Sequence, residues 1–316
     1  MLKVMIDRLV YNLIGLPKGA IFSEAVDFFL YDTIKIFLLL IVIIFIVSII
    51  RTFFSPEKTR AILGQKKSYV GNVLASLLGI VTPFSSCSAV PLFLGFVEAG
   101  APLGVTFSFL VASPMINEVA LVMLWGLFGF KVALLYIGSG LLVAVASGIV
   151  IGQLKVEDLV EKFDHKKPKV DIEGSVMNLK DRFDFAKGYT LDILKKIWIY
   201  VIIGIGLGAW IHGYVPADFL AKFARRGNWF AVPLATIIGI PLYSNAAGVI
   251  PLVSALTEKG VDLGTALAFM MAVTGLSLPE FLILRRVMKL KLLVIFASVV
   301  GGGIILTGYF FNYILR

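Results

Sequence analysis

Cysteine, histidine and charged residues are all scarce in this chain of 316 residues. The single cysteine, Cys87, excludes an intrachain disulfide and a zinc site built from several cysteines. The two histidines, His165 and His212, stand apart without neighbouring ligands, so the sequence predicts no metal site and no cofactor. The spaced glycines from Gly204 to Gly208 lie inside an apolar run rather than after a strand, which is not a phosphate-binding pattern.

Charged residues make up only 16% of the chain, whereas hydrophobic residues make up 59%, with a mean hydropathy of +0.95. This composition leaves too little polar sequence to cover a soluble globule of this length. We therefore expect a multi-pass protein surrounded by a lipid bilayer. The net charge of +9 is explained by positive residues in membrane-flanking loops and does not indicate nucleic-acid binding. The residues do not indicate an oligomer.

Six apolar runs are each about 20 residues or more, which at about 1.5 Å per residue crosses a hydrocarbon core of about 30 Å. They are 32–54, 103–125, 131–153, 193–215, 264–284 and 291–313. Residues 1–30 mix charged and apolar residues without the order of a signal peptide, so this segment is predicted to be amphipathic and to lie at the membrane surface.

The chain also repeats itself, because adding 160 to a residue number in the first half often gives the same residue type in the second. Matched pairs are Asp32 and Asp192, Lys35 and Lys195, Pro56 and Pro216, Gly79 and Gly239, Pro91 and Pro251, Glu98 and Glu258, Gly104 and Gly264, and Lys131 and Lys291. The offset predicts two homologous membrane repeats, 31–153 and 192–316, joined by a cytoplasmic linker, 154–191. Duplicated membrane units are typical of transporters.

Two further apolar stretches, 69–99 and 229–259, are interrupted in the middle by Pro, Ser and other small residues. Proline removes a backbone donor and disturbs the preceding turn, and unpaired backbone survives in a bilayer only where protein or a wet cavity covers it. We expect re-entrant or broken helical hairpins whose tips meet near the midplane. The alternative is a pair of ordinary spans with a proline kink.

Positive charge in short loops favours the cytoplasmic side. Loops 55–68 and 285–291 and the linker region 154–196 are rich in Lys and Arg, although loop 222–226 would place three positive charges outside. The pattern predicts an all-α polytopic membrane protein of two inverted repeats, each with three spanning helices and one re-entrant or broken hairpin.

Three motifs together resemble the predicted permease family that includes the ArsP organoarsenical efflux permeases. They are T-P-F-S-S-C-S-A-V-P-L-F at 82–93, P-L-Y-S-N-A-A-G-V-I-P at 241–251 and L-S-L-P-E-F-L-I-L-R-R-V-M-K at 276–289, and the resemblance covers about 30–313. It implies a permease of the inner (cytoplasmic) membrane, whose characterised relatives are associated with export of trivalent organoarsenicals.

The two interruptions are the expected substrate site. The family motif typically carries two cysteines where this chain has Ser85 and Cys87, and trivalent arsenic is held well by two thiolates but weakly by one. The substrate is therefore either a metalloid compound held by one thiol and hydroxyl groups, or another small solute. The expected contacts are Thr82, Pro83, Ser85, Ser86, Cys87, Ser88, Tyr243, Ser244 and Asn245.

Two glutamates, Glu118 and Glu280, fall inside predicted membrane segments, where an isolated charge costs about 2.5 kcal/mol or more. Each follows a proline expected to open the local helix. With Asn117, they are predicted to form a proton or cation site that couples transport to a gradient. The alternative is that each lies near the surface, as Glu280 would if it paired with Arg285 or Arg286.

No nucleotide-binding motif is present, so a gradient would supply the energy. The leading hypothesis is a proton-coupled exporter of a small solute, not an enzyme. Two alternatives stay open: an intramembrane phosphatase-like enzyme acting on a lipid, which would need a cationic group near the serine tip, and a passive channel, which would need no coupling carboxylate.

Overall fold

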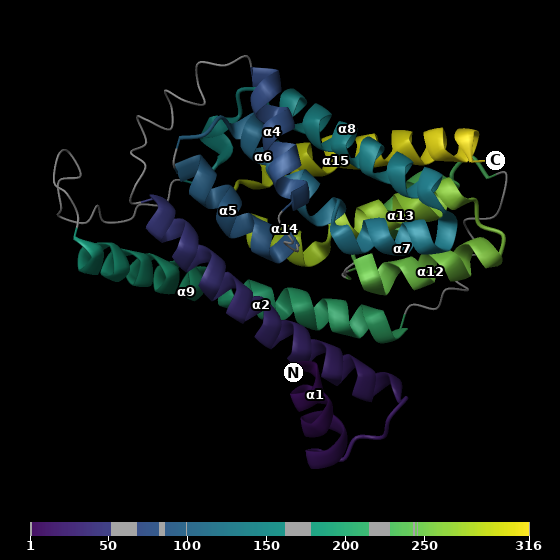
Figure 1. Cartoon of the computed structure of the whole chain (residues 1–316), viewed down its shortest axis with the longest axis horizontal. Helices are drawn as coiled ribbons and strands as arrows, with labels where there is room; N and C mark the ends of the chain where they lie inside the picture. Colours follow the sequence, from purple (N-terminus) through teal and green to yellow (C-terminus); the bar gives the residue numbers. More distant parts are fainter. Residues whose placement is uncertain are drawn as a thin grey trace.

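The computed structural model describes residues 2–51, 68–81, 86–98, 100–161, 178–214, 228–242, 244 and 246–315. In these residues the chain is helical apart from turns, short connections and isolated β-bridge positions (Figure 1). The first half contains α1 (Leu2–Asp7), the π-helix η1 (Arg8–Leu13), α2 (Ile21–Arg51), α4 (Ser68–Val81), α5 (Ser86–Glu98), α6 (Leu103–Met115), α7 (Glu118–Phe128) and α8 (Phe130–Gln153). The second contains η2 (Glu157–Leu159), α9 (Leu179–Tyr214), α11 (Ala231–Gly239), α12 (Ala246–Glu258), α13 (Leu263–Gly275), α14 (Leu278–Leu284) and α15 (Leu290–Ile314).

Four stretches of the described chain are long and apolar enough to cross a membrane: Phe22–Ile46, Phe130–Gln153, Leu263–Leu284 and Leu290–Ile314. The bent pair α6 and α7 makes a fifth if it is one span. Within the described residues, four of the six predicted spans are thus supported, or five if the bent pair is one span. The sixth expected span, 193–215, is part of α9, a helix of 36 residues that begins in the charged sequence before it and does not qualify among the described helices.

Two expected spans, 103–125 and 264–284, are not continuous helices. The first is divided between α6 and α7, whose axes differ by 46°, because Ile116 and Asn117 have extended backbone angles. The second is divided between α13 and α14 at Leu276 and Ser277. Two helix breaks that the apolar pattern alone does not reveal therefore lie within predicted membrane segments.

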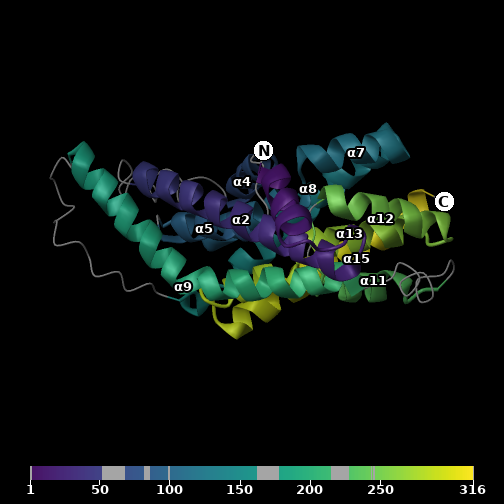
Figure 2. The ribbon, with the colours of Figure 1, turned by 90° about the horizontal axis from the view of Figure 1, so that it is seen from below.

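The two stretches expected to be broken are each divided into two short helices, α4 with α5 and α11 with α12. The first interruption, 82–85, lies outside the described residues. The helix after each interruption contacts the opposite half, since α5 packs against α14 and α12 packs against α7 (Figures 1 and 2). The second helix of each broken stretch thus lies between the halves.

Corresponding helices of the two halves also pack on one another, in the pairs α2 with α9, α6 with α13 and α8 with α15. Within each half, α6 packs on α4 and α8 just as α13 packs on α11 and α15. The halves also differ, because α7 packs on α8 whereas α14 packs on α9, and because α2 packs on α5.

Close glycine contacts recur at the offset of 160. A Cβ atom added at Gly79 would lie 3.0 Å from the Cβ of Ala112, and one added at Gly239 would lie 2.9 Å from the Cβ of Ala272. Gly104 approaches the backbone of α8 and Gly264 approaches the backbone of α15 in the same way. Small residues allow helices to approach closely in lipid, which explains why glycine stands at both members of each pair.

The amphipathic N-terminal segment folds back on the start of α2, away from the other helices (Figure 1). Lys3 forms ion pairs with Asp7 and with the buried carboxylate of Asp27. Burial lowers the pKa of Lys3, but its hydrogen bonds with Asp27 and Asp7 outweigh this effect and leave the pKa above its usual value. Apolar side chains on the same segment are exposed, among them Met5 and Leu13.

The base of the linker is attached to the loop that follows α14. Val160 and Met288 form an antiparallel β-bridge, Lys289 N–H donates to the carbonyl of Leu159 at 2.8 Å, and Glu161 N–H donates to Val287 at 2.9 Å. The linker base and the positively charged loop therefore lie on the same side of the molecule, as the charge pattern predicted. The charged sequence from Leu179 onward forms the first part of α9.

Candidate functional site: two helix breaks in contact

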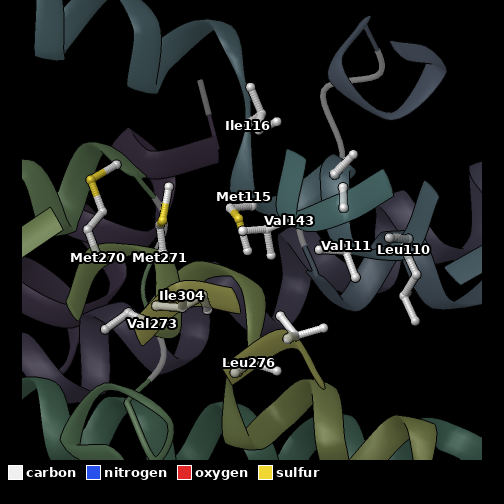
Figure 3. Packing of buried hydrophobic residues seen from close by; sticks show 14 of the residues in the cluster. Leu110, Val111, Met115, Ile116, Val143, Met270, Met271, Val273, Leu276 and Ile304 are labelled. Atoms are coloured by element: carbon white, nitrogen blue, oxygen red, sulfur yellow. The ribbon is translucent and has the colours of Figure 1, made fainter. Parts of the chain in front are cut away.

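The breaks between α6 and α7 and between α13 and α14 contact each other. Met115, the last residue of α6, packs against Gly275, the last residue of α13. A Cβ atom added at Gly275 would lie only 2.8 Å from the terminal methyl carbon of Met115. Figure 3 shows Met115 among buried side chains from both halves, including Val143, Met271 and Ile304. The two interrupted helices thus meet inside the core.

The depth of this contact follows from helix length. Both α6 and α13 contain 13 residues, which corresponds to about 20 Å of helix. A helix of that length starting at one edge of a hydrocarbon core of about 30 Å ends well inside it. At this depth the backbone groups left by the break have no water to bind, so protein groups or a ligand must satisfy them.

Polar groups of the protein satisfy much of the first break. The side chain of Asn117 accepts a hydrogen bond from the backbone N–H of Ala120 at 2.8 Å and caps α7. The hydroxyl of Tyr136, fully buried in α8, donates to the carbonyl of Met115 at 3.0 Å. The predicted proline-associated break is present two residues after Pro114, which itself lies inside α6, and Asn117 caps the next helix.

The second break is left open. Ser277 and Glu280 have the S-x-x-E spacing of a capping box, in which the hydroxyl and the carboxylate would each bind a backbone N–H. Here Ser277 makes no capping hydrogen bond, and its Oγ has no partner. Both carboxylate oxygens of Glu280 also lack a partner, although the residue is 0% exposed. Pro279 begins this helix, as predicted.

Among the described residues, Glu280 is thus a buried carboxyl group with no counter-charge. The alternative in which it pairs with Arg285 or Arg286 is wrong, since neither carboxylate oxygen has a hydrogen-bond partner. Burying an ionised group without a partner is costly, and buried charges are ordinarily paired or bound to an ion. A carboxyl in this setting can take up a proton, and with the Ser277 hydroxyl it can also offer oxygen ligands to a small cation.

Glu118 is in a different setting from its predicted counterpart. It lies in the first turn of α7 and its side chain is exposed, while Asn117 beside it is occupied as the helix cap. Glu118 and Glu280 follow similar sequence motifs but differ in burial, since Glu118 is exposed and Glu280 is buried. Only Glu280 is buried without a partner.

The predicted substrate contacts fall largely outside the described residues. Thr82, Pro83, Ser85, Tyr243 and Asn245 are not described. Ser86, Cys87 and Ser88 form the first turn of α5, which packs against α14, and Ser244 is partly buried between α11 and α12. The structure thus packs the helix that carries Cys87 against the helix that carries Glu280, across the two halves.

Sequence reasoning missed Tyr136, Thr274 and the unpartnered Ser113 and Ser277 as parts of this region. The spacing of Ser277 and Glu280 was a usable signal, because a capping box inside an apolar run indicates a helix start at membrane depth. Tyr136 carried no such signal, since a single tyrosine in an apolar run does not reveal its partner.

Comparisons with known proteins agree with a membrane permease. The UPF0718 protein MJ0584 of Methanocaldococcus jannaschii is 25% identical over 308 aligned residues, covering 75% of this chain and 83% of that protein. The UPF0718 protein YraQ of Escherichia coli is 24% identical, covering 78% and 69%. A Streptococcus mutans protein, provisionally named a two-component membrane permease complex subunit, is 24% identical, covering 56% and 58%. No solved structure gives a significant match.

The family model ArsP_1, described as predicted permease, matches residues 21–313. The match includes every spanning helix described above as well as both helix breaks. It leaves out only the N-terminal segment and the last three residues. The chain therefore belongs to the ArsP_1 family of predicted permeases.

Proposed function

We propose that this chain is a proton-coupled permease of the inner membrane that exports a small solute, either a trivalent organoarsenical or another thiophilic compound. The observation that carries the proposal is Glu280, a fully buried carboxyl group without a partner at a helix break between the two halves. A passive channel needs no such group, whereas a coupled carrier needs one that is loaded and released.

The two halves are inverted repeats in this proposal, and each contributes one re-entrant hairpin to the substrate path. The glycine contacts that recur at an offset of 160 support the duplication. The packing of α5 on α14 and of α12 on α7 supports a path between the halves. Discontinuous helices of this kind line the substrate and ion sites of many secondary transporters near the bilayer midplane.

The solute would pass the tips of the hairpins, where Cys87 supplies a soft ligand and the neighbouring serines supply hydroxyls. Glu280 would hold a proton in one facing and release it in the other. Because α5 packs against α14, a change in the charge of Glu280 can alter the surroundings of the solute site directly.

Everted membrane vesicles test this function. A proton gradient should drive uptake of phenylarsine oxide or of a solute found by screening thiophilic and non-thiophilic compounds, and an uncoupler should abolish it. Uptake that equilibrates the solute and ignores the uncoupler would indicate a channel. Release of phosphate from a lipid phosphate by the purified protein would favour the enzyme alternative.

A further inference from the structure

We propose that Tyr136 is a positioning residue. Its hydroxyl holds the end of α6 at Met115 against the end of α13, so that the helix break beside Glu280 keeps a fixed neighbour. Nothing in the sequence motifs points to Tyr136. Its importance comes from where the fold puts one hydroxyl group.

Tyr136 replaces a hydrogen-bond donor that α6 has lost. In a continuous helix, the carbonyl of Met115 would accept from the N–H four residues later, but the extended angles of Ile116 and Asn117 remove that partner. The Tyr136 hydroxyl donates to this carbonyl at 3.0 Å instead. Because Tyr136 is 0% exposed, water cannot take over this hydrogen bond.

The same hydroxyl reaches the other half. The side chain of Thr274, one residue before the end of α13, lies close enough to the Tyr136 hydroxyl to interact with it electrostatically, while its own hydroxyl donates to the carbonyl of Met270 at 3.0 Å. The next residue, Gly275, packs on Met115. One tyrosine from α8 therefore contacts the ends of both broken helices, α6 from the first half and α13 from the second.

The position that matches Tyr136 in the second half has no donor. Adding 160 gives Phe296, which is also fully buried and packs against Phe107 and Phe281. The phenyl ring cannot satisfy a carbonyl at the second break. This difference fits the unequal state of the two breaks, one held by Asn117 and Tyr136 and the other with its polar side chains unpaired.

An engineered disulfide measures this positioning directly. If residue 275 carried a Cβ atom, that atom would lie 3.8 Å from the Cβ of Met115, which matches the mean Cβ separation of disulfides, about 3.8 Å. We would combine Met115→Cys and Gly275→Cys with Cys87→Ser, add diamide as the oxidant, and follow the loss of free thiols by maleimide gel shift. The two thiols should close to a disulfide readily.

Adding Tyr136→Phe to this background should slow disulfide closure about fivefold, the factor expected for losing one hydrogen bond. The matched control is Tyr309→Phe, which removes a comparable hydroxyl-to-carbonyl bond, to Trp229 at 2.7 Å, far from the breaks. It should leave the closure rate unchanged. Equal closure rates with and without the Tyr136 hydroxyl, equal slowing by the control, or no disulfide in the parent would each overturn the proposal.

A transport measurement adds a second arm, and this arm alone rests on the proposed function. In everted vesicles, Tyr136→Phe should lower the maximal rate of phenylarsine oxide uptake and leave the half-saturating concentration unchanged, because the hydroxyl positions helices and does not touch the solute. A changed half-saturating concentration with an unchanged maximal rate would contradict a positioning role. If the parent protein takes up no solute, the proposed function fails for this probe, while the cross-linking result still decides the role of Tyr136.

Discussion

Replacing Glu280 by Gln tests whether the carboxyl group of Glu280 couples transport to the proton gradient or has only a structural role. Glutamine keeps the shape of the side chain but can neither bind nor release a proton. Since neither oxygen of Glu280 has a partner, no hydrogen bond or ion pair is lost in the exchange. We therefore expect Glu280→Gln to abolish gradient-driven uptake while the protein stays folded.

The expected effect on stability follows from the burial of Glu280, which is 0% exposed. An isolated charge at the centre of a membrane helix costs about 2.5 to 3.5 kcal/mol, and a neutral amide avoids this cost. The change in the free energy of unfolding should thus lie between zero, if the resting carboxyl is already neutral, and about 3 kcal/mol in favour of Gln. A partnered glutamate would give the opposite sign, because removing its charge would leave the partner unpaired.

The assay compares Glu280→Gln with Glu118→Gln in everted vesicles under an imposed proton gradient, and records thermal unfolding of both purified variants by tryptophan fluorescence. Glu118 is the matched control, because it also lies in the first turn of a helix after a break but is exposed. We expect Glu118→Gln to retain gradient-driven uptake. Normal gradient-driven uptake by Glu280→Gln would refute the coupling role, and destabilisation by more than about 2 kcal/mol would refute the unpaired state of the carboxyl.

Three further predictions concern other parts of the molecule. Gly264→Ala should destabilise the protein by about 1 to 3 kcal/mol in the same thermal unfolding assay, because the added methyl group meets the backbone of α15. Gly302→Ala is the control and should have little effect, because the space around Gly302 is open. Asp27→Asn should release the N-terminal helix, seen as faster trypsin cleavage within it. In the unsubstituted chain the ion pair raises the pKa of Lys3. The N-terminal helix should therefore be released only above about pH 10.5, where Lys3 loses its charge. Equal cleavage at pH 8 and pH 11 would contradict the pairing. Cys87→Ser should remove resistance to trivalent organoarsenicals while leaving the amount of membrane-inserted protein unchanged, and unchanged resistance would exclude the sulfur as a ligand.

The two ends of the short helix α14 have different hydrogen-bond partners. Helix α14 has only seven residues, and its two ends are held differently. Its C-terminal end continues into the loop that the linker base binds through Met288 and Lys289, whereas the polar side chains at its N-terminal end are unpaired. Backbone hydrogen bonds from the linker base thus hold the C-terminal end, whereas packing alone surrounds the side chains of Ser277 and Glu280 at the buried N-terminal end.

The membrane class, the all-helical architecture and the family could be predicted from the amino-acid sequence. Apolar composition, runs of about 20 residues and proline-interrupted stretches depend on local chain chemistry, which is why α8, α15 and the divided stretch at 229–259 agree with prediction. The offset of 160 likewise pointed to the glycines whose close contacts recur in the two halves.

Which of the candidate carboxyl groups is buried without a partner could be seen only in the folded protein. Glu118 and Glu280 follow similar motifs, yet one is exposed and the other is enclosed by helices from distant parts of the chain. The break at Leu276 and the bond from Tyr136 to Met115 depend on contacts between residues far apart in sequence, and hydrophobic periodicity carries no information about such contacts. Burial and hydrogen-bond pairing are properties of the packed protein, so the sequence could name the candidate carboxyl groups but could not choose between them.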